Sequence, residues 1–156
     1  MGKASPVTVR AAQPRDEGRW RKLWADYLEF YELTLAREIT DATWAKAMSE
    51  RSAIFMRVAD LDGTVVGFTL SLTHEGTWIT SLDCYLEDLF VDASARGNGV
   101  GRALLDDLVA LCRQNGWSRI YWHTAEDNAT ARKLYDSYVR SDGHIRYRIE
   151  FRGAAS

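Results

Sequence analysis

Three glycines within five residues stand where an apolar, strand-like run gives way to a helical pattern. Residues 96–101 read RGNGVG, and the apolar residues that follow recur at the three- and four-residue spacing of a helix. The first N–H groups of a helix have no partner within it, the helix dipole is positive there, and glycine lets the backbone approach an anion closely. We therefore predict a phosphate-bearing ligand at residues 96–102.

The spacing of these glycines excludes two familiar phosphate loops. The Walker loop needs a lysine after its last glycine, and none follows here. The dinucleotide fingerprint G-x-G-x-x-G fails because Arg102 or Leu104 occupies its last position. What remains is R-x-x-G-x-G, which resembles the pyrophosphate loop of the GNAT superfamily of acetyl-CoA-dependent N-acyltransferases.

Two further segments carry the same resemblance. YLEDLFV (residues 85–91) precedes the loop and DNATARKLY (residues 127–135) follows it, in the order and spacing in which the family places its cofactor strand and cofactor helix. Together with KLYDSYV and IRYRIEF, the first of these looks most like the branch that contains histone and polyamine N-acetyltransferases. The resemblance implies acetyl-CoA (coenzyme A) as the cofactor.

The resemblance also implies a set of cofactor-binding residues. Main-chain groups of the strand would hold the pantetheine arm, loop amides would hold the pyrophosphate, and the two arginines of the loop would add positive charge. The expected residues are Leu89, Phe90, Val91, Arg96, Gly97, Asn98, Gly99, Val100, Gly101, Arg102, Asn128, Ala131 and Tyr135. From its residue type alone, Asn128 is equally a helix N-cap, and residues 89–91 are equally a buried strand.

Acetyl transfer to an amine requires proton transfer as well as binding. In the family, a tyrosine seven residues after an asparagine protonates the departing thiolate, and Asn128 and Tyr135 have that spacing. A phenol has a pKa near ~10 and a thiol near ~8.5. The proton therefore moves downhill only if the site lowers the pKa of Tyr135 or excludes water. By its helical position alone, Tyr135 would be a core aromatic.

The group that takes the proton from the amine is predicted from an acid in the apolar strand. Glu87 is the leading candidate, because partial burial beside the thioester would raise the pKa of its carboxyl, which suits a base. Asp88 would point to the opposite face if the strand is regular, and one of this pair could be a solvated charge at the strand end. His123 is a rival base.

Acidic and aromatic side chains at helical spacing suggest where the amine would bind. Acids pair with a cationic acceptor, and aromatic rings attract it through cation–π contacts. The expected acceptor-binding residues are Tyr27, Glu29, Tyr31, Glu87, Trp122 and His123, with Glu32 close by in sequence. The two helix tyrosines also belong to an apolar stripe, and the helix acids could simply form its solvated face.

Alternating and periodic patterns predict the elements that position these residues. Alternation predicts strands at 7–10, 54–59, 66–72, 86–91, 119–124 and 144–151, with a D-G turn between the second and third. Helical periodicity predicts about four helices, at 14–31, 41–48, 100–115 and 128–138. We predict an α/β (α+β) GNAT fold with a mixed sheet of six to seven strands, in a single domain over residues 1–156.

Composition excludes several classes of protein. The net charge of −2 does not favour a nucleic-acid or membrane-surface partner. We find no apolar run of the ~20 residues that a membrane span needs and no signal core, so a cytoplasmic location is expected. Cys84 and Cys112 fall in predicted core segments as buried thiols. The three histidines, His74, His123 and His144, are scattered, so no metal is expected.

The predicted activity is an acetyl-CoA:amine N-acetyltransferase that works by direct attack in a ternary complex, because no cysteine stands where an acetyl-enzyme would need it. The acceptor would be a small primary amine, such as a polyamine or amino acid, or a lysine side chain. One alternative is a non-catalytic acyl-CoA-binding module. Another is a nucleotide- or NAD-binding α/β domain, which the failed fingerprints disfavour. The resemblance further implies a possible homodimer through the C-terminal strand.

Overall fold

One mixed sheet forms the centre of the computed structural model, which describes residues 6–151. The strands lie side by side in chain order, the first four antiparallel and the last pair parallel. They are β1 (Thr8–Ala11), β2 (Ile54–Leu61), β3 (Thr64–His74), β4 (Asp83–Val91) and β5 (Arg119–Trp122). The predicted mixed sheet and α/β class are confirmed.

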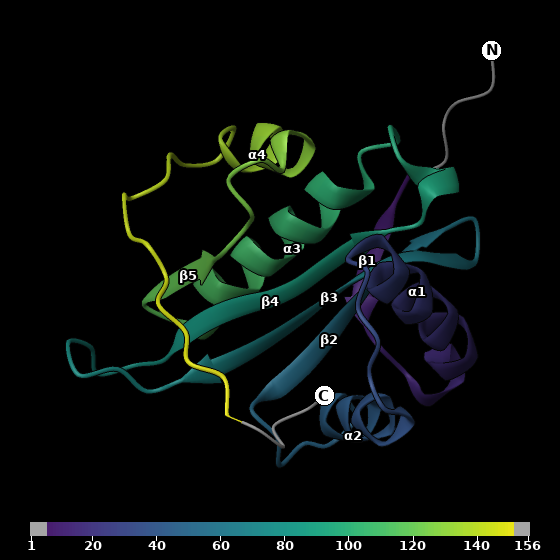
Figure 1. Cartoon of the computed structure of the whole chain (residues 1–156), viewed down its shortest axis with the longest axis horizontal. Helices are drawn as coiled ribbons and strands as arrows, with labels where there is room; N and C mark the ends of the chain where they lie inside the picture. Colours follow the sequence, from purple (N-terminus) through teal and green to yellow (C-terminus); the bar gives the residue numbers. More distant parts are fainter. Residues whose placement is uncertain (1–5, 152–156) are drawn as a thin grey trace.

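Helices pack against both faces of this sheet (Figure 1). Side chains of α1 and α2 pack on one face, and side chains of α3 pack on the other. The helices are α1 (Glu17–Phe30), α2 (Arg37–Ala47), α3 (Val100–Asn115) and α4 (Ala129–Tyr135), with short 3-10 turns at Pro14–Asp16 and Ala93–Ala95. The predicted domain of residues 1–156 extends at both ends beyond the described residues.

The predicted count of six to seven strands is wrong, because residues 6–151 form five. The segment 144–151 alternates in sequence but joins no strand, and it runs past β5 as the yellow trace of Figure 1. Its apolar side chains are between 75% and 88% exposed: Ile145, Tyr147, Ile149 and Phe151. Alternation yields a strand only where an edge takes up the backbone hydrogen bonds and a surface covers the apolar side.

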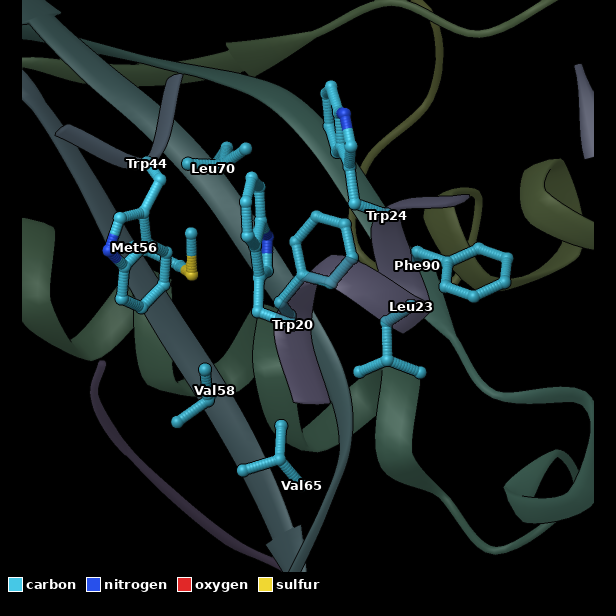
Figure 2. Close-up of a cluster of buried hydrophobic side chains, with 10 residues drawn as sticks. Trp20, Leu23, Trp24, Trp44, Met56, Val58, Val65, Leu70 and Phe90 are labelled. Carbon is cyan, nitrogen blue, oxygen red and sulfur yellow. The ribbon is translucent and has the colours of Figure 1, made fainter. Parts of the chain in front are cut away.

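A cluster of tryptophans fixes α1 on the sheet (Figure 2). The ring of Trp20 stacks on Trp24 of the same helix at 5.5 Å and lies 5.3 Å from Trp44 of α2. Both α1 tryptophans also contact Phe68 of β3, with ring centroids 6.1–6.3 Å apart. Burial of these large rings anchors the helix, so its C-terminal turn is held over the end of β4.

A β-bulge interrupts β4 at Glu87. Leu70 of β3 pairs with Asp88, whereas the next residue of β3, Ser71, pairs with Leu86. Glu87 is therefore the extra residue on β4.

The bulge changes which face of the sheet each side chain reaches. Before it, Leu86 packs against α3, and Tyr85 points to the opposite face. After it, Phe90 packs with the α1 cluster and Asp88 contacts α1. The side-chain alternation thus restarts at Glu87, and it brings Asp88 to the face that carries Tyr85.

Candidate active site

The free outer edge of β4 is the first feature of the site. β5 pairs with β4 only from Asp83 to Leu86, where Leu86 lies opposite Trp122. Beyond the bulge, no strand among the described residues pairs with this edge of β4, and only the Val91 carbonyl accepts a side-chain hydrogen bond there, from Arg96. The predicted pantetheine contacts at Leu89, Phe90 and Val91 fall on this open edge.

The glycine loop connects β4, through the 3-10 turn at Ala93–Ala95, to α3. Its amides take no part in the hydrogen bonds of the helix. Gly97 and Gly99 have φ angles of 82° and 75°, a left-handed conformation that glycine adopts without strain. The N–H of Ala103 is the first to bond back into the turn, donating to the Gly99 carbonyl at 2.9 Å. The amides of residues 97–102 precede it, so they remain available for an anion.

The start of α3 also touches α4. A Cβ atom added at Gly101 would lie 3.3 Å from Cδ2 of Leu134, so only glycine fits here without a shift. The side chain of Asn128 caps α4 by accepting a hydrogen bond from the N–H of Ala131 at 3.3 Å. The loop and the predicted cofactor helix therefore lie together, with Tyr135 directly after Leu134.

Two arginines extend from the loop in different directions. Arg96 donates to the Val91 carbonyl at 3.3 Å, and its guanidinium lies over the rings of Phe30 and Phe90 at 5.7 and 5.9 Å. The Arg102 side chain turns toward α4 and donates to Ser137 Oγ at 3.0 Å. Both add positive charge beside the free amides.

Tyr135 ends α4 and lies at the end of β5, where the pairing with β4 stops. Its ring packs on Trp122 of β5, with centroids 5.3 Å apart, and the residue is half-buried. Burial, with a smaller contribution from Tyr31, raises the pKa of Tyr135. The role of an acid at Tyr135 requires either a lowered pKa or the exclusion of water. The pKa of Tyr135 is not lowered, but its partial burial excludes part of the water.

Across from α4, α1 presents a hydrogen-bonded carboxylate. The hydroxyl of Tyr27 donates to Oδ1 of Asp88 at 2.6 Å, and Asp88 is half-buried. Burial raises the pKa of the Asp88 carboxyl to about 6; the Tyr27 hydrogen bond opposes this rise, and the charge of Glu87 adds to it. Asp88 is thus ionised at neutral pH, yet more basic than an ordinary aspartate.

Tyr31 connects the two sides of the site. Its ring lies 4.9 Å from Tyr27, and both burial and the charge of Asp88 raise its pKa. It also influences the pKa of Tyr135. The charges of these groups are thus close enough to influence one another.

Sequence reasoning placed Asp88 on the opposite face because it assumed a regular strand. The bulge brings Asp88 toward Tyr27 and leaves Glu87, the predicted base, exposed at the bulge itself. The only signal in the sequence was the pair of adjacent acids within an apolar run.

The other predicted acceptor residues divide between different surfaces. Trp122 packs toward α3 and Tyr135, whereas His123 Nδ1 lies 3.3 Å from the Tyr85 hydroxyl on the opposite face of the sheet. Glu29 is exposed and lies two residues along α1 from Tyr27, which places it on the far side of the helix. The structure does not bring Glu29 to the site.

Within residues 6–151, no group of three or more His, Cys, Asp or Glu side chains could hold a metal ion. In the same part of the chain, no helix combines the length and the apolar character that crossing a membrane requires.

The model of the acetyltransferase (GNAT) family matches residues 19–138 of this sequence. The chain belongs to the GNAT family. Enzymes of this family take the acetyl group from acetyl-CoA, and this GNAT chain is accordingly an acetyl-CoA-dependent N-acyltransferase. The open edge of β4 and the free loop amides fit the pantetheine arm and the pyrophosphate of that cofactor, and the left-handed glycines keep side chains out of its path.

Named relatives of this GNAT chain act on amines and amino acids. It is 29% identical over 144 residues to a D-amino-acid N-acetyltransferase of Saccharomyces cerevisiae, covering 91% of this chain and 89% of the relative. It is 27% identical to an L-amino acid N-acetyltransferase of Escherichia coli, with 86% and 82% covered. The crystal structure of a ribosomal-protein-alanine N-acetyltransferase from Brucella melitensis has the same fold, with a TM-score of 0.76, 22% identity, and 94% and 99% covered. The histone and polyamine branch stays a prediction of the sequence.

Proposed function

We propose that this GNAT enzyme acetylates the primary amine of a small acceptor, such as an amino acid or a polyamine, or of a lysine side chain, by direct attack in a ternary complex. The single observation that carries the proposal is the half-buried Asp88 carboxylate, which Tyr27 holds on the part of β4 that β5 leaves unpaired. Relatives named for amino-acid acetylation support a small acceptor.

Asp88 takes the proton from the incoming ammonium in this proposal. An alkylammonium has a pKa near ~10.4, so it arrives charged and must lose a proton before its nitrogen can attack. Asp88 is ionised at neutral pH and retains basicity, because burial raises its pKa to about 6. Tyr27 holds the carboxylate in place through the 2.6 Å hydrogen bond. Glu87, the leading candidate base from the sequence, is exposed beside Asp88, and in this proposal its charge attracts the cation.

Tyr135 supplies a proton to the departing thiolate. Its position on Trp122 keeps the hydroxyl in a partly dry environment, where a thiolate is also a stronger base than in water. Neither cysteine offers a route through an acetyl-enzyme. Cys84 and Cys112 are buried between β4 and α3, and their mutual hydrogen bond, together with burial, raises the pKa of Cys84. The burial of both thiols supports direct transfer.

The test is thiol release from acetyl-CoA across a panel of amines, with Asp88→Asn and Glu87→Gln compared in parallel. We expect Asp88→Asn to lower kcat/KM by about 10²–10⁴-fold and Glu87→Gln to act mainly on KM. The reverse order would make Glu87 the base. Stabilisation by acetyl-CoA without thiol release from any amine would favour the alternative of a non-catalytic acyl-CoA-binding module.

We also propose a homodimer that uses the C-terminal segment. Four apolar side chains of residues 145–151 are at least 75% exposed, which is unusual for a row of large apolar residues on a monomer surface. A second copy of the same segment would cover them with a complementary row. A cytoplasmic location stays a prediction of the sequence.

A further inference from the structure

An arginine of α1 joins the ends of two strands at the point where the chain turns from β4 toward the glycine loop (Figure 1). Arg19 Nε donates to the Val65 carbonyl near the start of β3 at 2.8 Å, and its guanidinium forms an ion pair with Asp92, the first residue after β4. A guanidinium presents several donors in a rigid fork, so one side chain holds both partners in a fixed arrangement.

Asp92 in turn fixes the start of the turn that leads to the loop. Its second carboxylate oxygen, Oδ1, accepts hydrogen bonds from the N–H of Ser94 at 3.0 Å and from the Ser94 hydroxyl at 2.9 Å. Its own N–H donates to the Val66 carbonyl at 2.8 Å, and its carbonyl accepts from the N–H of Ala95 at 2.9 Å. Every polar group of Asp92 therefore has a partner, and these bonds hold the 3-10 turn Ala93–Ala95 against the ends of the strands.

The turn ends where the loop amides begin. Ala95 is buried in the same cluster as Val100 of α3, and its carbonyl accepts a hydrogen bond from the side chain of Asn98 at 3.1 Å. A Cβ atom added at Gly97 or Gly99 would meet nothing within 4 Å, so the loop itself has few contacts that could hold it. The position of its amides therefore depends on the turn before it, and through that turn on α1.

We propose that Arg19 is a positioning residue for acetyl-CoA that acts through Asp92. The inference rests on the placement of the pyrophosphate at the glycine loop, and it applies to any acceptor amine. Amides that already point at a ligand bind it without the cost of ordering the loop. Loss of the Arg19–Asp92 pair should therefore weaken the binding of acetyl-CoA and leave the acceptor site and the chemical step unchanged. A partly exposed ion pair contributes little to the free energy of unfolding, so the fold should persist.

The experiment measures the Kd of acetyl-CoA without any acceptor, by calorimetric titration of the full-length wild type, Arg19→Gln and Arg57→Gln. Arg57 is the matched control, because it pairs with Asp107 at 2.8 Å, in α3 about two turns beyond the loop. The side chains of that pair are 19% and 19% exposed, against 29% and 18% for Arg19 and Asp92. Thiol release with an amine that the enzyme accepts then gives kcat and the KM of each substrate.

We expect Arg19→Gln to raise the Kd and the KM of acetyl-CoA about 10-fold, the size of a typical coupling between contacting groups. The values of kcat and of KM for the acceptor should stay near those of the wild type. Arg57→Gln should lower the melting temperature by a similar amount and keep the wild-type Kd. In an Asp92→Asn background, where the ion pair is already lost and Ser94 keeps its acceptor, Arg19→Gln should have no further effect on the Kd.

A wild-type Kd in Arg19→Gln, or an equal rise in both arginine variants, overturns the inference. A rise that persists in the Asp92→Asn background also overturns it, because Arg19 would then not act through Asp92. If Arg19→Gln does not fold, Arg19→Lys replaces it; this variant keeps a charge but loses the fork, and the inference then requires a rise of about threefold. Absence of transfer to every amine would remove the proposed function and leave this inference standing, whereas a wild type that does not bind acetyl-CoA would remove both.

Discussion

The hydroxyl of Tyr135 and the carboxylate of Asp88 owe their chemistry to partial burial near the point where β4 and β5 stop pairing. Burial raises the pKa of both groups, which keeps the tyrosine protonated and makes the aspartate a better base. These are the protonation states that the acid and the base of the proposed mechanism require at the start of a reaction cycle.

Replacing Tyr135 by phenylalanine tests the proposed role of its hydroxyl as the acid. The ring would still pack on Trp122 at the end of α4, so the fold should persist, while kcat falls by about 10²-fold. Steady-state kinetics with circular dichroism would measure both effects. Tyr138→Phe is the matched control, because the Tyr138 hydroxyl donates to Asp106 and to a main-chain carbonyl. Wild-type turnover in Tyr135→Phe would remove this role.

The ionisation of Asp88 should also change the free energy of unfolding. An unfolded aspartate titrates near ~3.9 and the folded one at about 6, so the native state binds the proton more tightly. The contribution of Asp88 to the free energy of unfolding is therefore largest when its carboxyl is protonated. This contribution falls as the pH rises from about 4 to 6. Above that range the ionised form costs about 1–2 kcal/mol, after allowing for partial exposure.

Asp88→Asn removes this cost and keeps an acceptor for Tyr27. We expect its melting temperature to exceed that of wild type by a few degrees at pH 7.5, with the difference closing near pH 4. Thermal unfolding of both proteins across this range measures the difference directly. A difference in melting temperature that does not vary with pH would mean that Asp88 has an ordinary pKa.

Among single residues, the sequence predicted best those whose positions depend on local spacing. Tyr135 follows Asn128 by seven residues, and α4 begins after Asn128 as its N-cap and ends at Tyr135. The position of Asp88 depends instead on how β3 and β4 pair, which is set by contacts between residues distant in the chain. No local pattern marks a bulge, so the alternation was continued through Glu87.

At the scale of elements, β4, the glycine loop and α3 form one continuous unit. The loop needs left-handed backbone at Gly99 because α3 begins at the next residue with its amides turned outward. This unit was predictable, because strand, turn and helix signals follow one another within about two dozen residues.

Gly99→Glu separates anion binding from backbone strain. A glutamate there adds bulk and negative charge where the pyrophosphate is expected, so stabilisation by acetyl-CoA should be lost; the wild type should gain about 2.7 kcal/mol at ~100 times Kd. Gly63→Glu is the control, because Gly63 has a φ of 80° in the β2–β3 turn and a Cβ there meets nothing within 4 Å. Both variants carry the same left-handed strain. If Gly99→Glu still responds to acetyl-CoA, the pyrophosphate lies elsewhere.

The whole molecule is organised so that one face of the sheet is covered by α3 and the other only in part by α1 and α2. The length of the chain predicted one domain with one core, since length limits how much core a chain can build. They did not predict that residues 144–151 would stay out of the sheet, because strand pairing depends on a free edge and not on alternation alone.

The exposed apolar row of the C-terminal segment predicts the oligomeric state of the whole molecule. If a second copy covers its apolar row, the wild type should sediment at about twice the mass of the chain, and Ile149→Glu should shift it to the monomer, because a buried unpaired charge is strongly unfavourable at an interface. Arg148→Gln, on the adjacent position, should leave the dimer intact. A wild type that is monomeric at all accessible concentrations would contradict the dimer.

The bulge at Glu87 divides β4 into two halves in which the side-chain alternation has opposite phase. Odd-numbered residues before the bulge and even-numbered residues after it point to the same face of the sheet. In the first half the odd residue Tyr85 stacks on Tyr121 on the face opposite α3, and in the second the even residues Asp88 and Phe90 share that face. If β4 alternated regularly through Glu87, this change of phase would be lost and the Asp88 carboxylate would turn toward α3. The face that the carboxylate reaches therefore depends on a register offset of one residue between β3 and β4, so this stretch should tolerate exchanges of residue type more readily than a shift of register.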